Sequence, residues 1–130
     1  MIESINPPGA SFPGVSQAVL VRGGNLVALS GHVPVDANGD LVEGDFETQL
    51  TAVFNNIGRT LAAAGTDFLS VIRFTMYVTD YSPAMLPVLK MVRARYISKE
   101  RPPASALVGV AALYDPRVRV EIDALAVIPG

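Results

Sequence analysis

Glu121 is the foremost candidate for chemistry in this chain. It stands within the apolar run "VEIDALAV", where an unpaired charge would be costly to bury. Such a carboxylate is either paired, for instance with Arg119, or lies in a wet pocket where it could serve acid–base chemistry. The sequence leaves both alternatives open.

His32 is the one histidine, and the chain has no cysteine. An imidazole at this place could act as a general base, although a histidine at a strand end is more often simply hydrogen-bonded there. A zinc site would need carboxylates for most of its ligands. We therefore predict no metal site and no thiol chemistry.

Three other motifs favour structural roles. The loop "DANGDLVEGD" has its glycines at the wrong spacing for a calcium loop, so we interpret it as a surface turn. "RGGN" lacks the lysine and the helix of a phosphate loop and reads as a hairpin turn. "RARYISKER" carries cations that could touch RNA, but a solvated helix end is the favoured interpretation. Those cations are Arg93, Arg95, Lys99 and Arg101.

The composition indicates a single domain over residues 1–130. Half of the residues are hydrophobic and 17% are charged, so we expect part of the apolar surface to lie against other copies of the chain. The net charge of −2 disfavours a nucleic-acid partner. The start "MIESINPPG" lacks the apolar core of a signal peptide, and no run approaches the roughly 20 apolar residues of a membrane span. We expect a cytoplasmic protein with no membrane contact.

The hydrophobic pattern predicts two helices and five strands. A helix from Asp45, its N-cap, to Gly65 carries an apolar stripe at helical spacing, and a second helix runs through Met85 and Tyr96 with a start at Ser82-Pro83 or later. Strands are expected at 15–21, 26–31, 70–80, 105–113 and 118–128, the first two paired as a hairpin through "RGGN".

This order, β-β-α-β-α-β-β, predicts an α+β domain in which two helices cover one face of a sheet. The other face mixes apolar residues with Arg119, Glu121 and Asp123. Packing against other subunits is the expected way to cover it.

Several motifs together resemble the RidA/YjgF family of reactive-intermediate deaminases. They are "SQAV", "ALSGHVPVD", "LAAAG", "VIRFTMYVTD", "RPPAS" and "VRVEIDALAV", collinear over about residues 14–128. The resemblance implies a chorismate-mutase-like fold and a homotrimeric barrel with three clefts between subunits. It also implies hydrolysis of enamines and imines without metal or cofactor.

Carried over by motif, the resemblance implies that Ser30 and Gly31 bind substrate and that Glu121 acts with a water. His32 lies nearby in the sequence. The family's "PARS" arginine, which grips a substrate carboxylate, is replaced by Ser105. Three further cleft positions also differ from the family pattern: Val15, Val88 and Leu107.

The lost guanidinium predicts a departure from typical 2-aminoacrylate deaminases. A bidentate charge-assisted pair is worth about 1.5–3 kcal/mol, and a serine does not replace it. The alignment of the motifs does not support Arg73, Arg95 or Arg101 as a replacement for this arginine. We therefore expect a trimer whose cleft takes a small, uncharged or weakly polar molecule, with hydrolysis of an imine or related carbonyl derivative left open. The alternatives are a non-catalytic ligand-binding or chaperone-like trimer and, disfavoured by charge, an endoribonuclease.

Overall fold

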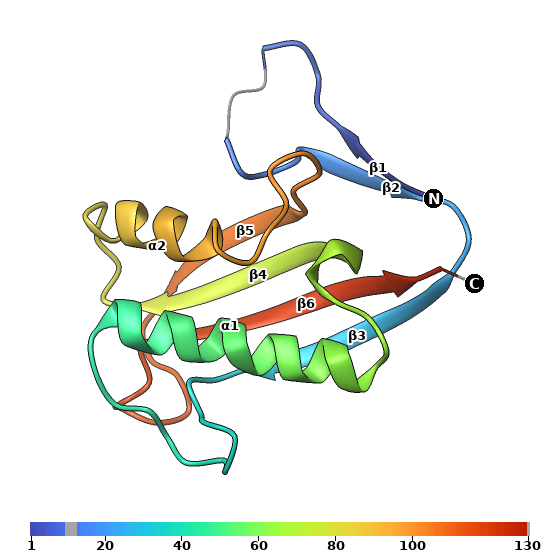
Figure 1. Cartoon of the computed structure of the whole chain (residues 1–130). Coiled ribbons are helices and arrows are strands. Elements are labelled where there is room, and N and C mark those ends of the chain that lie inside the picture. Colours follow the sequence, from blue (N-terminus) through green and yellow to red (C-terminus); the bar gives the residue numbers. More distant parts are fainter. Residues whose placement is uncertain (10–12, 130) are drawn as a thin grey trace.

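Four strands form the main sheet in the order β3-β6-β4-β5 (Figure 1). The computed structural model describes residues 1–9 and 13–129. β6 runs antiparallel to both of its neighbours, whereas β4 and β5 are parallel, because a helix returns the chain between them. The strands are β3 Asn25–His32, β4 Val71–Thr79, β5 Ala104–Val110 and β6 Val120–Ile128.

Strict alternation along the central strands gives the sheet two different faces. In β6, Val120 and Ile122 are fully buried, while Glu121 and Asp123 are half-buried on the opposite face. β4 places Phe74 and Met76 inward in the same way. The predicted division of the last strand is confirmed, and we call the face that carries Glu121 the outer face.

Both helices lie against the inner face, as predicted (Figure 1). α1 spans Phe46–Ala63, and the Asp45 side chain caps it by accepting a hydrogen bond from the Thr48 amide at 2.9 Å. The hydrogen bond to Thr48 lowers the pKa of the Asp45 carboxyl. Gly65, with φ of +83°, ends the helix in the left-handed conformation that favours glycine.

α2 spans Met85–Arg93, so the later of the two predicted starts is correct. The Met85 amide donates to the Ser82 carbonyl at 3.0 Å. Ser82 and Pro83 therefore belong to a turn that precedes the helix. Pro87 falls at the third helical position, where a backbone N–H would have no partner within the helix. A 3₁₀ turn, η1 Phe68–Ser70, leads from α1 into β4.

The predicted hairpin of residues 15–21 with residues 26–31 is wrong. β2, Ala18–Val21, pairs instead with an N-terminal strand that was not predicted, β1 Ile2–Ile5, in a separate two-stranded sheet. β3 pairs with β6 along nearly its whole length. The reason is the turn at Gly23-Gly24: a Cβ on Gly24 would lie 2.7 Å from the Ile128 carbonyl oxygen, so the bare glycine lets the chain turn onto the end of β6.

Among the described residues of one chain, no helix covers the outer face. Leu26 is 66% exposed, and Val108, opposite Tyr77 in the β4–β5 register, is 39% exposed. These two apolar side chains stand at opposite edges of the sheet, on β3 and β5, and the half-buried carboxylates of Glu121 and Asp123 lie between them on β6.

Candidate functional site

Glu121 lies directly against the backbone of Gly31. The register of β3 against β6 shifts between Leu29 and His32, so Ser30 and Gly31 together oppose one residue of β6, which is a β-bulge. A Cβ on Gly31 would fall 2.1 Å from Glu121 Oε2. The bulge and the missing side chain together make the space that the carboxylate occupies.

Arg119 is not the partner of Glu121. Its guanidinium Nε donates to the Gly44 carbonyl at 3.0 Å, and its backbone amide donates to Gln49 Oε1 at 2.7 Å. Within the described residues, Glu121 forms no ion pair. Of the two alternatives that the sequence left open, pairing with Arg119 is excluded.

A tyrosine–aspartate pair flanks Glu121 on the outer face. Tyr77, opposite Glu121 in β4, donates its hydroxyl to Asp123 Oδ2 at 3.1 Å. This hydrogen bond, aided by the negative charge of Asp123, raises the pKa of Tyr77 above its ordinary value of 10.0. The sequence pattern placed Asp123 on the face of Glu121 but gave no role in the site to Asp123 or Tyr77, although the alternation of β4 puts Tyr77 on that face as well.

His32 faces away from Glu121, toward the helices. Its Nδ1 donates to the Ser30 carbonyl at 2.6 Å, which leaves Nε2 to accept from the Thr60 hydroxyl of α1 at 2.7 Å. Its strand partner is the inward-facing Ile122. His32 therefore ties the end of β3 to α1, which matches the structural interpretation rather than the general base.

A second group of predicted residues lines a cavity of about 540 Å³ on the inner side of β5, which we call the Ser105 pocket. Ser105 and Leu107 project to this side because they pair with the inward-facing Phe74 and Met76. Residues 13–17, which precede β2 and which we call the strap, form one wall of the pocket, and the Ser16 amide donates to the Pro103 carbonyl at 3.1 Å. The lining residues are Pro13, Val15, Gln17, Met76, Leu86, Leu89, Lys90, Arg93, Ser105 and Leu107.

Val88 is not among these lining residues. It is half-buried on α2 and packs against the hydrophobic core. The structure thus brings Val15, Ser105 and Leu107 together, and leaves Val88 apart from them.

Arg93 in the Ser105 pocket is the residue that sequence reasoning placed wrongly. The sequence pattern predicts a solvated helix end for it, yet Arg93 is only 8% exposed. Burial lowers the pKa of its guanidinium. The signal was present in the sequence, since Arg93 stands one helical turn after Leu89 and next to Val92, on the apolar face of α2.

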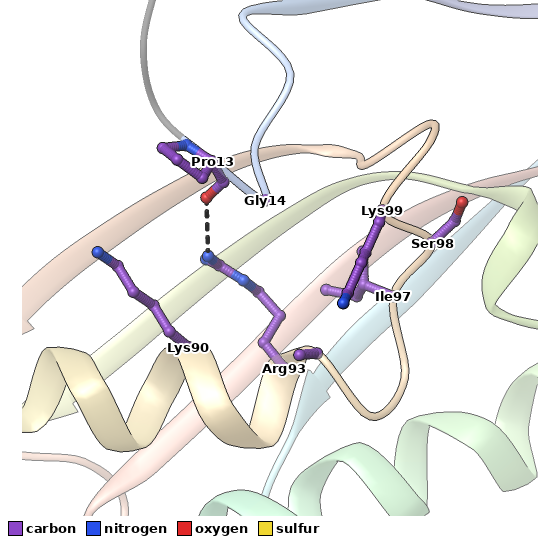
Figure 2. Close-up of a pocket in the computed structure, with 8 residues that line it drawn as sticks. Pro13, Gly14, Lys90, Arg93, Ile97, Ser98 and Lys99 are labelled. Carbon is purple, nitrogen blue, oxygen red and sulfur yellow. Dashed lines mark hydrogen bonds between the residues drawn. The ribbon is translucent and has the colours of Figure 1, made fainter.

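The other cations of "RARYISKER" do not form one basic patch. Arg95 approaches Glu47 at 3.9 Å, and Arg101 donates to the Ile2 and Leu69 carbonyls at 3.4 and 2.5 Å. Lys99 lines a smaller cavity of about 400 Å³, the Lys99 pocket, together with Lys90 and Arg93 (Figure 2). The cations of this run therefore lie in three separate places in the structure.

The two groups of candidate residues lie on opposite faces of the sheet. Glu121 and Gly31 belong to the outer face at the β3–β6 side, while Ser105 faces inward on β5, at the other edge. A ligand held in the Ser105 pocket of one chain cannot touch Glu121 of that same chain, because the sheet itself separates its two faces and β4 lies between β5 and β6.

Two negative findings apply to residues 1–9 and 13–129. They contain no cluster of three or more histidine, aspartate or glutamate side chains that could hold a metal ion. None of the helices is both long and apolar enough to cross a membrane.

Comparison with known proteins connects these features to one family. The model of the family described as Endoribonuclease L-PSP matches residues 10–128. Protein DfrA of Myxococcus xanthus is 42% identical over 128 residues, covering 97% of this chain and 93% of that protein. The human 2-iminobutanoate/2-iminopropanoate deaminase is 34% identical over 129 residues, covering 98% of this chain and 88% of the deaminase.

Solved structures share the fold. The Rid-family protein YyfB from Yersinia pestis, described as of unknown function, superposes with a TM-score of 0.89 at 33% identity and covers 98% of both chains. RidA from an Antarctic Psychrobacter superposes with a TM-score of 0.72 at 37% identity and covers 92% of both chains.

Proposed function

Because the chain belongs to the RidA/YjgF (Endoribonuclease L-PSP) family, we propose that it binds a small imine, enamine or related carbonyl derivative between subunits and hydrolyses it without a cofactor. The observation that carries this proposal is the contact of Glu121 with Gly31. A half-buried carboxylate without an ion-pair partner in the described chain, held in a space made by a glycine bulge, is placed for acid–base chemistry.

A second copy of the chain completes the site. The outer face of one subunit carries Glu121, and the Ser105 pocket of another supplies the binding cavity. We propose a closed homotrimer, because in a ring each subunit can present its outer face to one neighbour and its β5 edge to the other. The exposed Leu26 and Val108 would then be covered.

The reaction balances with water as the only co-reactant. The Glu121 carboxylate takes a proton from a water molecule while the water oxygen bonds to the imine carbon, and the proton passes to the imine nitrogen. The resulting carbinolamine transfers its hydroxyl proton to nitrogen, the C–N bond breaks, and ammonia leaves a ketone behind. The Gly31 amide and the Ser30 hydroxyl would donate to the polar groups of the substrate.

Non-catalytic ligand binding by the same trimer is the second candidate. It is favoured by Ser105, which stands where the family motif has its arginine. A relative from Lactococcus lactis named putative regulator AldR, 34% identical over 130 residues, also agrees with such a role. Cleavage of RNA is disfavoured, because Arg93 is buried and Arg95 and Arg101 are engaged within the chain.

Ammonia release separates these candidates. Wild type is given a panel of enzymatically generated imines, with and without a carboxylate, alongside Glu121→Gln. An enzyme loses turnover in Glu121→Gln while its affinity for the ketone product persists. Turnover unchanged by this substitution contradicts the mechanism, and the absence of ammonia release by wild type on the whole panel favours the binding protein.

The cytoplasm is the compartment that we propose, and fractionation of the source cells checks it.

A further inference from the structure

We propose that Arg93 of α2 holds a small carboxylate in the Ser105 pocket, and so supplies from a helix the guanidinium that β5 lacks. This inference rests on the proposed function, since it names the class of substrate for the same site. It replaces the expectation, drawn from Ser105, of an uncharged ligand.

The first argument is the environment of the guanidinium. Arg93 is 8% exposed, and its hydrogen bond within the described chain runs from Nη2 to the Pro13 carbonyl at 3.4 Å. No described carboxylate lies within 4.0 Å of it, whereas Arg22, Arg95 and Arg117 each have one. A guanidinium has five N–H donors, and a buried charge is costly unless it is paired. The donors that make no hydrogen bond within the described chain are not fully buried, so they can reach a ligand in the pocket.

The second argument is that the backbone is shaped around this side chain. Gly14 has φ of +83°, and a Cβ there would lie 2.8 Å from Arg93 Nη2. The strap thus passes over the guanidinium at a residue without a side chain (Figure 2). This close fit keeps Arg93 pointing away from α2 and toward the strap.

The third argument is the sign of the surrounding charge. Lys90 lines both the Ser105 pocket and the Lys99 pocket, and Lys99 approaches from the opposite side of the latter (Figure 2). No acidic residue of the described chain lines either cavity. In a chain whose net charge is −2, this concentration of cations makes the region attractive to an anion.

The walls select a carboxylate with a small apolar body. Met76, Leu86, Leu89 and Leu107 form the apolar part of the Ser105 pocket, whose volume of about 540 Å³ suits a small metabolite. A planar guanidinium matches a planar carboxylate through two parallel hydrogen bonds.

The test is a binding titration, which does not depend on turnover. The probe is 2-oxobutanoate, with its neutral methyl ester as the comparison. Wild type should bind the carboxylate at least tenfold more tightly than the ester. Arg93→Met should weaken binding of the carboxylate about ten- to hundredfold and leave the ester unchanged. The matched control is Arg95→Met, an exposed arginine two residues away, which should change neither affinity.

A rescue variant identifies the guanidinium itself as the cause. Adding Ser105→Arg to Arg93→Met puts a guanidinium back into the same pocket from β5, and it should restore most of the lost affinity for the carboxylate. Arg93→Lys keeps the charge without the planar fork and should fall between wild type and Arg93→Met. Arg93→Lys also replaces Arg93→Met in the titration if Arg93→Met does not fold.

The following outcomes overturn the inference. Equal affinity of wild type for the ester and the carboxylate overturns it without any variant. Affinities that are unchanged in Arg93→Met, or that fall equally for both probes, also overturn it. Inorganic phosphate binding more tightly than 2-oxobutanoate would overturn the choice of carboxylate. If the inference fails while Glu121-dependent ammonia release from neutral imines persists, the proposed function stands alone.

Discussion

The carboxylate of Glu121 occupies the space where a side chain on Gly31 would be, with Oε2 only 2.1 Å from the position of the missing Cβ. The two residues come from different strands, and a β-bulge in β3 brings them together. The glycine is therefore as much a part of the candidate site as the acid.

Gly31→Ala should displace the Glu121 side chain and reduce ammonia release by about tenfold or more. The free energy of unfolding should change by less than about 1 kcal/mol, because the contact is with the end of a flexible side chain. Kinetics and urea denaturation measure the two effects. Gly109→Ala is the matched control, since its Cβ would meet Tyr81 at an ordinary 3.6 Å. Full activity in Gly31→Ala would show that the position of Glu121 does not matter.

Thr60→Val tests the structural role of His32. The variant removes the hydrogen bond at His32 Nε2 and should lower the free energy of unfolding by about 1 kcal/mol, with turnover unchanged. Denaturant titration and steady-state kinetics decide between the roles. A tenfold loss of turnover at unchanged stability would return His32 to the list of catalytic candidates.

The Tyr77–Asp123 hydrogen bond predicts a dependence of stability on alkaline pH. The raised pKa means that the folded chain holds the Tyr77 proton more tightly than the unfolded chain does. The stabilisation is complete below pH 10, the ordinary pKa of tyrosine, and is lost as the pH rises through the higher folded value.

Ultraviolet titration of tyrosine against pH measures this shift. Asp123→Asn should bring the pKa of Tyr77 back toward its ordinary value, and Tyr77→Phe should remove the shifted titration from the curve. If all tyrosines titrate together in wild type and in Asp123→Asn, the hydrogen bond does not persist in solution.

Gln49 should be the most sensitive polar residue for stability. Fully buried on α1, its amide donates to the Val42 and Arg117 carbonyls at 3.0 and 2.8 Å and accepts from the Arg119 amide at 2.7 Å. Gln49→Leu leaves three backbone groups without partners and should cost about 3 kcal/mol or more. Thr51→Val, on the same helix, should cost less than about 1 kcal/mol. Equal urea midpoints for the two variants would contradict this ranking.

Val108→Glu tests the proposed trimer. Wild type should have three times the mass of one chain in solution, because the outer face needs a cover. A charge at Val108 should shift the population toward monomers and reduce ammonia release along with the mass, which light scattering after size exclusion measures. A monomeric wild type that releases ammonia at full rate would contradict the shared site.

What the sequence by itself determined is local. The period of 3.6 residues and the Asp45 and Gly65 caps predicted α1, and the alternation of β6 predicted which side of the sheet Glu121 would face. The family motifs predicted the fold and pointed to Ser105, Val15 and Leu107, which share one pocket, and to Val88, which does not line it.

The tertiary structure decided which distant segments meet. Strand partners depend on the length and burial of strands far away in sequence, so β3 pairs with β6 although a turn links it to β2. A local pattern also cannot tell whether a charged residue on a helix faces water or another segment. The fold alone puts Arg93 under the strap at Gly14 and beside Ser105, because those contacts join residues about 80 and 12 positions apart.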